Sequence, residues 1–206
     1  MDSYFTPAGE GFGEFTEKRS RFIGYLKPVK TEAEAAAFIS EIKKKHYDAR
    51  HNCSAYVLSE GNVTRYSDDG EPQGTAGQPI LAVINGKELK DVCIVVTRYF
   101  GGILLGTGGL VRAYTEGAKL AVEDAGIVKM ALWTDILIPC PYNLYERVRR
   151  LVDDKSGIIE DTEFGAEVLI TAVLPKDAVP AFCDSLRELT GGSVAPEICE
   201  SRFRGV

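Results

Sequence analysis

The sequence is poor in the side chains that most often perform catalysis or bind metals. It has two histidines and five cysteines, and no two cysteines form a CxxC pair. An odd number of cysteines without paired spacing argues against both a disulfide framework and a zinc site. We therefore expect reduced, mostly buried thiols, no metal and no cofactor.

Long apolar runs are also missing. No stretch approaches the roughly 18 consecutive apolar residues that a transmembrane helix needs. The beginning of the chain, MDSYFTPAGEGFGEF, has neither the basic region nor the apolar segment of a secretory signal. These absences predict a cytoplasmic protein with no membrane partner.

Basic charge is not in excess. The chain has 24 Lys and Arg against 30 Asp and Glu, which argues against a surface coated in nucleic-acid-binding charge. Residues 1–130 hold 16 basic and 17 acidic side chains, whereas residues 131–206 hold 8 and 13. A local basic patch therefore fits only the first part of the chain.

The patterns that are present predict α/β (α+β) structure in two domains, 1–130 and 131–206. In the first domain we expect a strand over 20–30, a helix from Thr31, strands over 52–59 and 63–67, a polar loop over 68–78, a helix over 79–86, a buried strand over 91–100 and a helix over 108–125. Gly126 ends the last helix, so we place the junction between Gly126 and Trp133.

The pattern restarts near residue 131. It predicts a strand over 131–140, a helix over 144–152, strands over 157–164 and 166–174, a helix over 179–189 and a strand over 191–201. The order βαββαβ is typical of the ferredoxin-like fold.

The stretch TRYFGGILLGTGG, residues 97–109, places five glycines ahead of a helix. It lacks the lysine of a Walker loop and the sixth-position glycine of the dinucleotide fingerprint. Two interpretations stay open: a bare helix start that binds an anion such as an RNA phosphate, or glycines that permit close packing. The candidate anion-binding residues are Arg65, Arg98, Gly101, Gly102, Gly106, Thr107, Gly108, Gly109 and Arg112.

Arg98 ends the buried strand, where α/β proteins often place functional groups. It fits either an exposed binding role or a structural ion pair with Asp68 or Asp69. Arg112 fits an ion pair with Glu116 one turn further along the helix. The polar loop that could border a functional cleft carries Asp68, Asp69, Glu71 and Gln73, and its carboxylates favour capping of nearby backbone over metal binding.

His51 and Cys53 are two residues apart and share one face of a strand. A Cys–His nucleophile pair would use that geometry, but the apolar surroundings of Cys53 favour a packed thiol. No GxSxG or HExxH motif occurs. We expect no catalytic residues and do not favour an enzyme.

Four segments together resemble the YigZ/IMPACT family: KRSRFIGYL, ARHNCSAYVL, YSDDGEPQGTAGQPIL and VVTRYFGGILLGTGGLVRAY. The resemblance implies a first domain with the left-handed βαβ arrangement of elongation factor G domain IV, shared with GHMP kinases. It implies a second domain similar to elongation factor G domain V, as in the bacterial YigZ branch.

The resemblance also implies a link to translation. We expect a non-catalytic regulatory protein that binds RNA, a ribosomal surface or a protein partner of the translation machinery. The alternative is an enzyme that acts on a phosphorylated or peptide-like small molecule in a cleft between residues 65–78 and 97–112.

Overall fold

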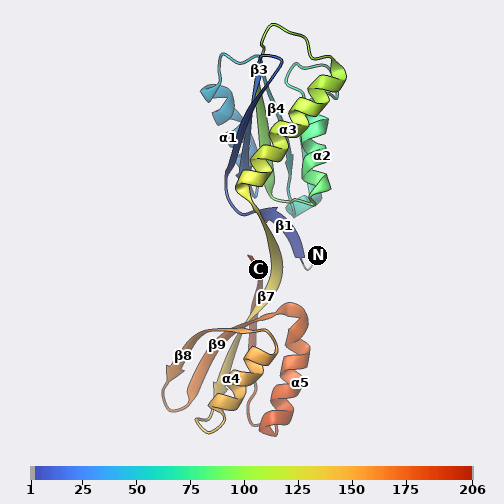
Figure 1. Ribbon diagram of the computed structural model, residues 1–206. Helices are drawn as coiled ribbons and strands as arrows, with labels where there is room; N and C mark the ends of the chain where they lie inside the picture. Colours follow the sequence, from blue (N-terminus) through green and yellow to red (C-terminus); the bar gives the residue numbers. More distant parts are fainter. Residues whose placement is uncertain (1–2, 206) are drawn as a thin grey trace. The chain divides into compact units, whose positions relative to one another are not determined.

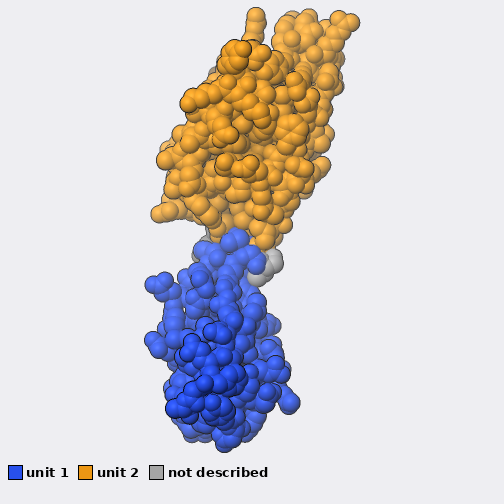
Figure 2. All heavy atoms as spheres, turned by 90° about the vertical axis from the view of Figure 1, so that its left-hand side faces the viewer, with its two compact units in different colours: residues 1–3, 130–206 blue, residues 4–129 orange. Residues whose placement is uncertain are grey.

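The computed structural model describes residues 3–205, which contain two five-stranded sheets and divide into two compact units (Figure 1). The N-terminal unit comprises Tyr4–Lys129, and the C-terminal unit begins at Met130 (Figure 2). Both units combine helices with antiparallel sheet, so the protein is α+β. Among residues 3–205, every helix is too short or too polar to cross a lipid bilayer.

Five antiparallel strands form the sheet of the N-terminal unit, in the spatial order β2-β3-β6-β4-β5. Along the chain these are β2 (Gly11–Glu17), β3 (Ser20–Pro28), β4 (His51–Val57), β5 (Thr64–Ser67) and β6 (Val92–Tyr99). The central strand β6 is buried from Val92 to Arg98, as its apolar run predicts.

Helices cover both faces of this sheet (Figure 1). They are α1 (Glu32–Lys45) on one face, and α2 (Gly77–Gly86) and α3 (Thr107–Ala125) on the other; the short 3-10 helix η1 is Glu60–Asn62. Side chains of β6 alternate between the two cores: Ile94 and Val96 pack with α2 and α3, while Cys93 and Val95 pack with α1. Two helical layers explain why this antiparallel strand is apolar at every position from Val92 to Val96.

The two helical crossovers of this sheet have opposite hands. The β3-α1-β4 and β5-α2-β6 connections each join parallel strands, because both members of each pair are antiparallel to the strand between them. The second crossover joins strands of the opposite direction, moves across the sheet the opposite way and lies on the opposite face. Each reversal inverts the hand, so one crossover is left-handed, against the usual rule.

Helix α3 lies directly on β2 and β3 because glycines face each other across the contact. A Cβ at Gly24 would collide with the Gly117 carbonyl of α3, and a Cβ at Gly117 would lie 3.0 Å from Val96 Cγ1. Close packing is thus the role of glycines in β3 and in the middle of α3.

Several boundaries differ from those predicted from the sequence. Strands β1 (Ser3–Pro7) and β2 are absent from the prediction, because glycine, proline and charged residues interrupt their apolar alternation. Thr31 caps α1 as predicted: its side chain accepts from the Glu34 N–H at 3.1 Å. The strand predicted to begin at 131 begins at Ile127, so β7 (Ile127–Cys140) is one continuous strand from Gly126 onward.

The C-terminal unit has the predicted order βαββαβ. After β7 come α4 (Tyr145–Asp154), β8 (Ile158–Phe164), β9 (Val168–Pro175), the 3-10 helix η2 (Lys176–Ala178), α5 (Val179–Thr190) and β10 (Glu197–Gly205). β7 pairs with β9 and β10, and β9 pairs with β8, all antiparallel. Its fully buried side chains include Ile138, Val148, Ile170 and Phe182. The last strand lies later than the predicted 191–201.

A buried carboxylate ties three segments of the N-terminal unit together. Asp91, 1% exposed, accepts hydrogen bonds from Tyr4 Oη at 2.8 Å, Lys30 Nζ at 2.7 Å and the Ser59 N–H at 2.8 Å. Burial alone would raise the pKa of Asp91. The Lys30 ammonium and the hydrogen bonds outweigh burial and hold that pKa below its ordinary value.

We expect Asp91→Asn to lower the free energy of unfolding at neutral pH by about 1.5–3 kcal/mol, the usual worth of hydrogen bonds to a charged group. The contribution of Asp91 is fully present above its unfolded pKa of roughly 3.9 and disappears as pH falls through the lower folded pKa. Denaturant melts across the acid range should therefore converge for the two proteins. Asp177→Asn, at an exposed carboxylate in η2, is the control; parallel curves for Asp91→Asn would contradict the assignment.

Independent folding of residues 131–206 stays a prediction. We expect this fragment to be soluble and to unfold cooperatively, because it holds a buried core of its own. Circular dichroism during a thermal melt would measure this. A fragment without a transition would show that earlier residues, beginning with the Ile127 end of β7, are required.

Candidate functional site

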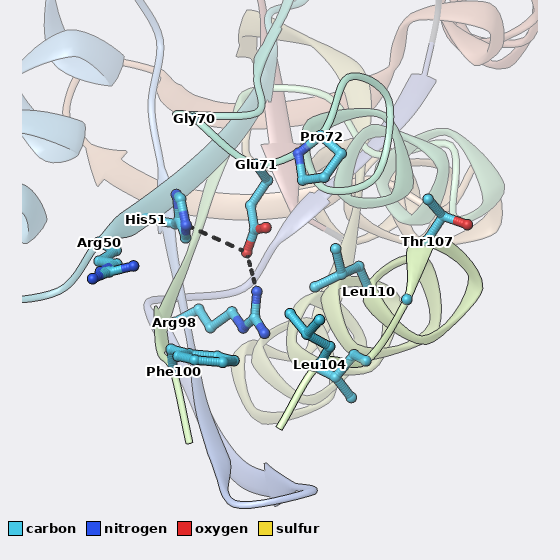
Figure 3. A pocket seen from close by; sticks show the side chains of 12 residues that line it. Arg50, His51, Gly70, Glu71, Pro72, Arg98, Phe100, Leu104, Thr107 and Leu110 are labelled. Carbon is cyan, nitrogen blue, oxygen red and sulfur yellow. Dashed lines mark hydrogen bonds and ion pairs between the residues drawn. The ribbon is translucent and has the colours of Figure 1, made fainter. Parts of the chain in front are cut away.

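A pocket of about 430 Å³ opens in the N-terminal unit where the loop before α2 meets the loop before α3 (Figure 3). It is lined by Arg50, His51, Gly70, Glu71, Pro72, Arg98, Phe100, Leu104, Leu105, Gly106, Thr107 and Leu110. Two segments that the sequence singles out, the acidic loop and the glycine-rich stretch, thus contribute to one cavity.

A buried ion pair forms the floor of the pocket. Arg98 Nη1 donates to Glu71 Oε1 at 2.7 Å, and the two side chains are 6% and 3% exposed. Tyr114 Oη of α3 donates to the same oxygen at 2.7 Å, and burial raises the pKa of Tyr114. The partner of Arg98 is therefore Glu71, and the predicted pairing with Asp68 or Asp69 is wrong.

Two aromatic rings lie against the Arg98 guanidinium. Its Cζ lies 5.6 Å from the centre of the Phe22 ring and 5.4 Å from that of Phe100. Phe22 is fully buried, whereas Phe100 is 44% exposed and lines the pocket. Removing Glu71 would leave a buried charge without a partner, which typically costs about 3–5 kcal/mol.

The other two acidic residues of the loop shape the backbone. Asp68 accepts from the N–H groups of Gly74, Ala76 and Gly77, and so satisfies the start of α2. Asp69 accepts from the Asn52 N–H at 2.7 Å and pairs with Lys43 Nζ at 2.6 Å. Backbone capping by these carboxylates is confirmed. Within residues 3–205, no cluster of His, Cys, Asp and Glu is arranged to hold a metal ion.

The start of α3 is bare. Gly106 precedes the helix with φ of 73°, which favours glycine, and offers no side-chain cap. The N–H groups of Thr107, Gly108 and Gly109 receive no side-chain acceptor among the described residues, although the helix dipole makes this end positive. A Cβ at Gly108 would meet only Arg112 Nη1, at 3.7 Å. Packing therefore does not require glycine at position 108.

The glycines of the glycine-rich stretch differ in their surroundings. Gly101 is required by packing, since a Cβ there would collide with the backbone of Arg19. Gly102 and Gly106 have positive φ and open surroundings, and Gly108 has open surroundings in a helical conformation. Close packing thus explains the first glycine, whereas the last ones leave the helix start accessible.

His51 faces the pocket in a fixed orientation. Its Nδ1 lies 2.9 Å from the Asp69 carbonyl oxygen, which can only accept, so Nδ1 carries the proton. Nε2 is then directed at Glu71 Oε1, 4.0 Å away. Cys53 is fully buried and its thiol donates to the Asp68 carbonyl; burial raises the pKa of that thiol. Cys53 is thus a packed thiol, as predicted, and its hydrogen bond goes to the Asp68 carbonyl and not to His51.

Other candidates lie outside the pocket. Arg65 Nε is 3.9 Å from Glu32 Oε2 at the start of α1, on the opposite face of the sheet. Arg112 is exposed, borders a separate hollow, and makes no ion pair with Glu116 among the described residues, so that predicted pair is wrong. Asp68, Asp69 and Gln73 do not line the cavity.

Sequence reasoning missed the apolar wall and Arg50. Phe100 and Leu104 carried a signal, because large apolar side chains in a glycine-rich loop are seldom left exposed without a role; Leu104 is 83% exposed. Arg50 carried none, since it precedes a strand in a polar segment. The strand-to-loop contact that places it at the pocket is visible only in the fold.

Two family profiles match the chain. Residues 18–122 match the Impact N-terminal domain, which includes the whole pocket. Residues 138–193 match a domain of unknown function, DUF1949, in the C-terminal unit.

Individual relatives extend over nearly the full length. The IMPACT family member YvyE of Bacillus subtilis is 39% identical over 193 residues, which cover 93% of this chain and 89% of the relative. The IMPACT family member YigZ of Escherichia coli is 36% identical over 197 residues, covering 94% and 97%. A solved structure titled "Crystal structure of an hypothetical protein" superposes with a TM-score of 0.62 at 35% identity, covering 97% of this chain and 98% of the other. The chain therefore belongs to the IMPACT family.

Proposed function

We propose that this protein is a translation-associated RNA-binding protein, and that the N-terminal unit contacts an RNA phosphate at the start of α3. The observation that carries the proposal is that the uncapped helix start and Arg98 line the same pocket. Backbone N–H groups without partners and the positive end of the helix dipole favour a phosphate oxygen there. Arg50, exposed at the same cavity, adds positive charge.

The charge distribution supports this placement. The C-terminal part of the chain carries 13 acidic against 8 basic side chains, whereas the N-terminal part is nearly neutral. Contact with RNA is therefore expected from the N-terminal unit. The proposed likeness of the two units to domains IV and V of elongation factor G agrees with a ribosomal setting.

Arg98 is a poor place to test the phosphate contact. Its charge is already neutralised by Glu71, and Arg98→Glu would set two buried carboxylates against each other. Such a variant would lose stability for reasons unrelated to RNA. Gly108 is the better position, because its surroundings have room for a side chain.

We expect Gly108→Glu to abolish RNA binding while preserving the fold. A carboxylate in the first turn suits the helix dipole by about 0.3–1 kcal/mol, and replacing a helical glycine adds roughly 0.5–1 kcal/mol. The same carboxylate repels a phosphate. Gly108→Ala is the matched control, since it adds only the Cβ.

Fluorescence anisotropy with a labelled RNA at fixed low salt, beside a thermal melt of each variant, measures this prediction. Equal affinity of Gly108→Glu and Gly108→Ala for the RNA would show that the helix start does not contact an RNA phosphate. Unchanged affinity of both relative to the original protein would overturn the proposed site altogether.

Ribosome co-sedimentation over a salt series separates RNA binding from its rivals. Binding through a few phosphates should weaken log-linearly with salt, with a slope near −0.9 per duplex phosphate contact, or about −0.7 on single strands. A protein-only contact should change far less with salt. Absence from the ribosomal fraction at every salt concentration would contradict the proposal.

His51 favours a second candidate function, an enzyme that acts on a phosphorylated or peptide-like small molecule. The hydrogen bond from Nδ1 to the Asp69 carbonyl orients the His51 ring at a cavity that also offers N–H donors at a helix start, the groups that general acid–base catalysis uses. Such an enzyme would turn over substrate without co-sedimenting with ribosomes.

A further inference from the structure

We propose that the Arg98–Glu71 side of the pocket receives an unpaired nucleobase, and that the phosphate of the same RNA segment lies at the start of α3. This inference rests on the proposed function and narrows the partner to single-stranded RNA. In this proposal one end of the cavity, at Arg98 and Glu71, binds the base, and the other end, at Thr107, binds the phosphate (Figure 3).

The buried ion pair makes this end of the pocket unsuitable for an anion. Glu71 Oε1 lies 2.7 Å from Arg98 Nη1, so a phosphate that reached the guanidinium would also approach a carboxylate. Both side chains are shielded from water, which strengthens that repulsion. The phosphate is therefore directed to the helix start, where the N–H groups of Thr107 and Gly108 have no side-chain acceptor among the described residues.

A neutral group with adjacent donor and acceptor atoms suits the pair. Glu71 Oε2 accepts no hydrogen bond, and Arg98 Nη2 makes none, among the described residues. The pair thus leaves one acceptor oxygen and one donor nitrogen without a hydrogen-bond partner within residues 3–205, in a nearly buried setting. The Watson–Crick edge of a nucleobase carries neighbouring donor and acceptor atoms, and that edge is free only where the base is unpaired.

The neighbouring side chains provide a surface for a flat ring. Phe100 is 44% exposed, and its ring centre lies 5.4 Å from Arg98 Cζ, so an accessible aromatic ring lies next to the guanidinium. Across the cavity, Leu104 and Leu110 form an apolar wall (Figure 3). A cavity of about 430 Å³ falls within the ordinary range for small ligands and so has room for a base with its sugar.

Exposure of Leu104 is explained by the same arrangement. Its side chain is 83% exposed on a loop bounded by Gly102 and Gly106, both at positive φ. An apolar side chain in that position is costly in water but gains contact area when a base lies between it and Phe100. The apolar wall is therefore complete only when the pocket is occupied.

The test compares a short unstructured RNA with a duplex of the same length, by fluorescence anisotropy on the full chain at fixed low salt. We expect the single strand to bind more tightly. Phe100→Leu keeps an apolar side chain and removes the flat ring, and should weaken single-strand binding by about 5- to 100-fold, the range for loss of one base–aromatic stack. Binding of the duplex should stay unchanged.

Two variants control for the fold and for general aromatic effects. Phe100→Trp retains a flat ring and should preserve single-strand binding. Phe12→Leu alters a phenylalanine of similar exposure, 48%, that does not line the pocket, and should change neither affinity. Thermal melts of all three variants identify any loss through unfolding; if Phe100→Leu unfolds, equal single-strand and duplex affinities of the original protein would still overturn the proposal.

Failure of this inference and failure of the proposed function give different results. Equal affinity for single strand and duplex, with Gly108→Glu defective toward both, would refute the base pocket and keep the phosphate site. Insensitivity of RNA binding to Gly108→Glu would refute the proposed function itself. A preference for single strands that survives Phe100→Leu would place the base elsewhere and so refute the inference.

Discussion

The buried Arg98–Glu71 pair is the interaction on which the site depends. Glu71 belongs to an irregular loop, and it reaches the end of β6 only because Arg98 and the Tyr114 hydroxyl hold its carboxylate. Replacement of such a pair by apolar side chains is often neutral or stabilising, so stability alone does not account for it. Its contribution is positional: it fixes the acidic loop, the central strand and α3 around one cavity.

Much of the fold could be predicted because local patterns and tertiary packing agree. The apolar run of β6 indicates a strand covered on both faces, and the spacing after residue 131 gives βαββαβ. Strand β2 escaped prediction because Gly11 and Gly13 are required by close packing against α3 and not by strand propensity, and β1 because it is short and ends in proline. The antiparallel order of the first sheet, with its opposite-handed crossovers, is set by contacts between distant segments, which periodicity does not encode.

The site was predictable as two separate segments and not as one constellation. The glycine-rich stretch and the acidic loop both stand out from composition, yet which carboxylate reaches Arg98 depends on the path of the loop. Asp68 and Asp69 are closer to a strand end in sequence, but backbone N–H groups occupy them, which leaves Glu71 for the guanidinium. His51 and Phe100 acquire significance only through neighbours that come from other elements.

Contact of α3 with the sheet through Gly24 and Gly117 has a consequence for genetics. Since backbone meets backbone there, any side chain at Gly24 must lift the helix as a rigid rod, and the far end of that rod is the helix start at Thr107. A substitution in the middle of the sheet would then resemble a binding-site lesion in phenotype. Suppressors of such an allele would be sought among substitutions that replace a side chain beneath the helix, such as that of Val96, by a smaller one, rather than among substitutions at the cavity.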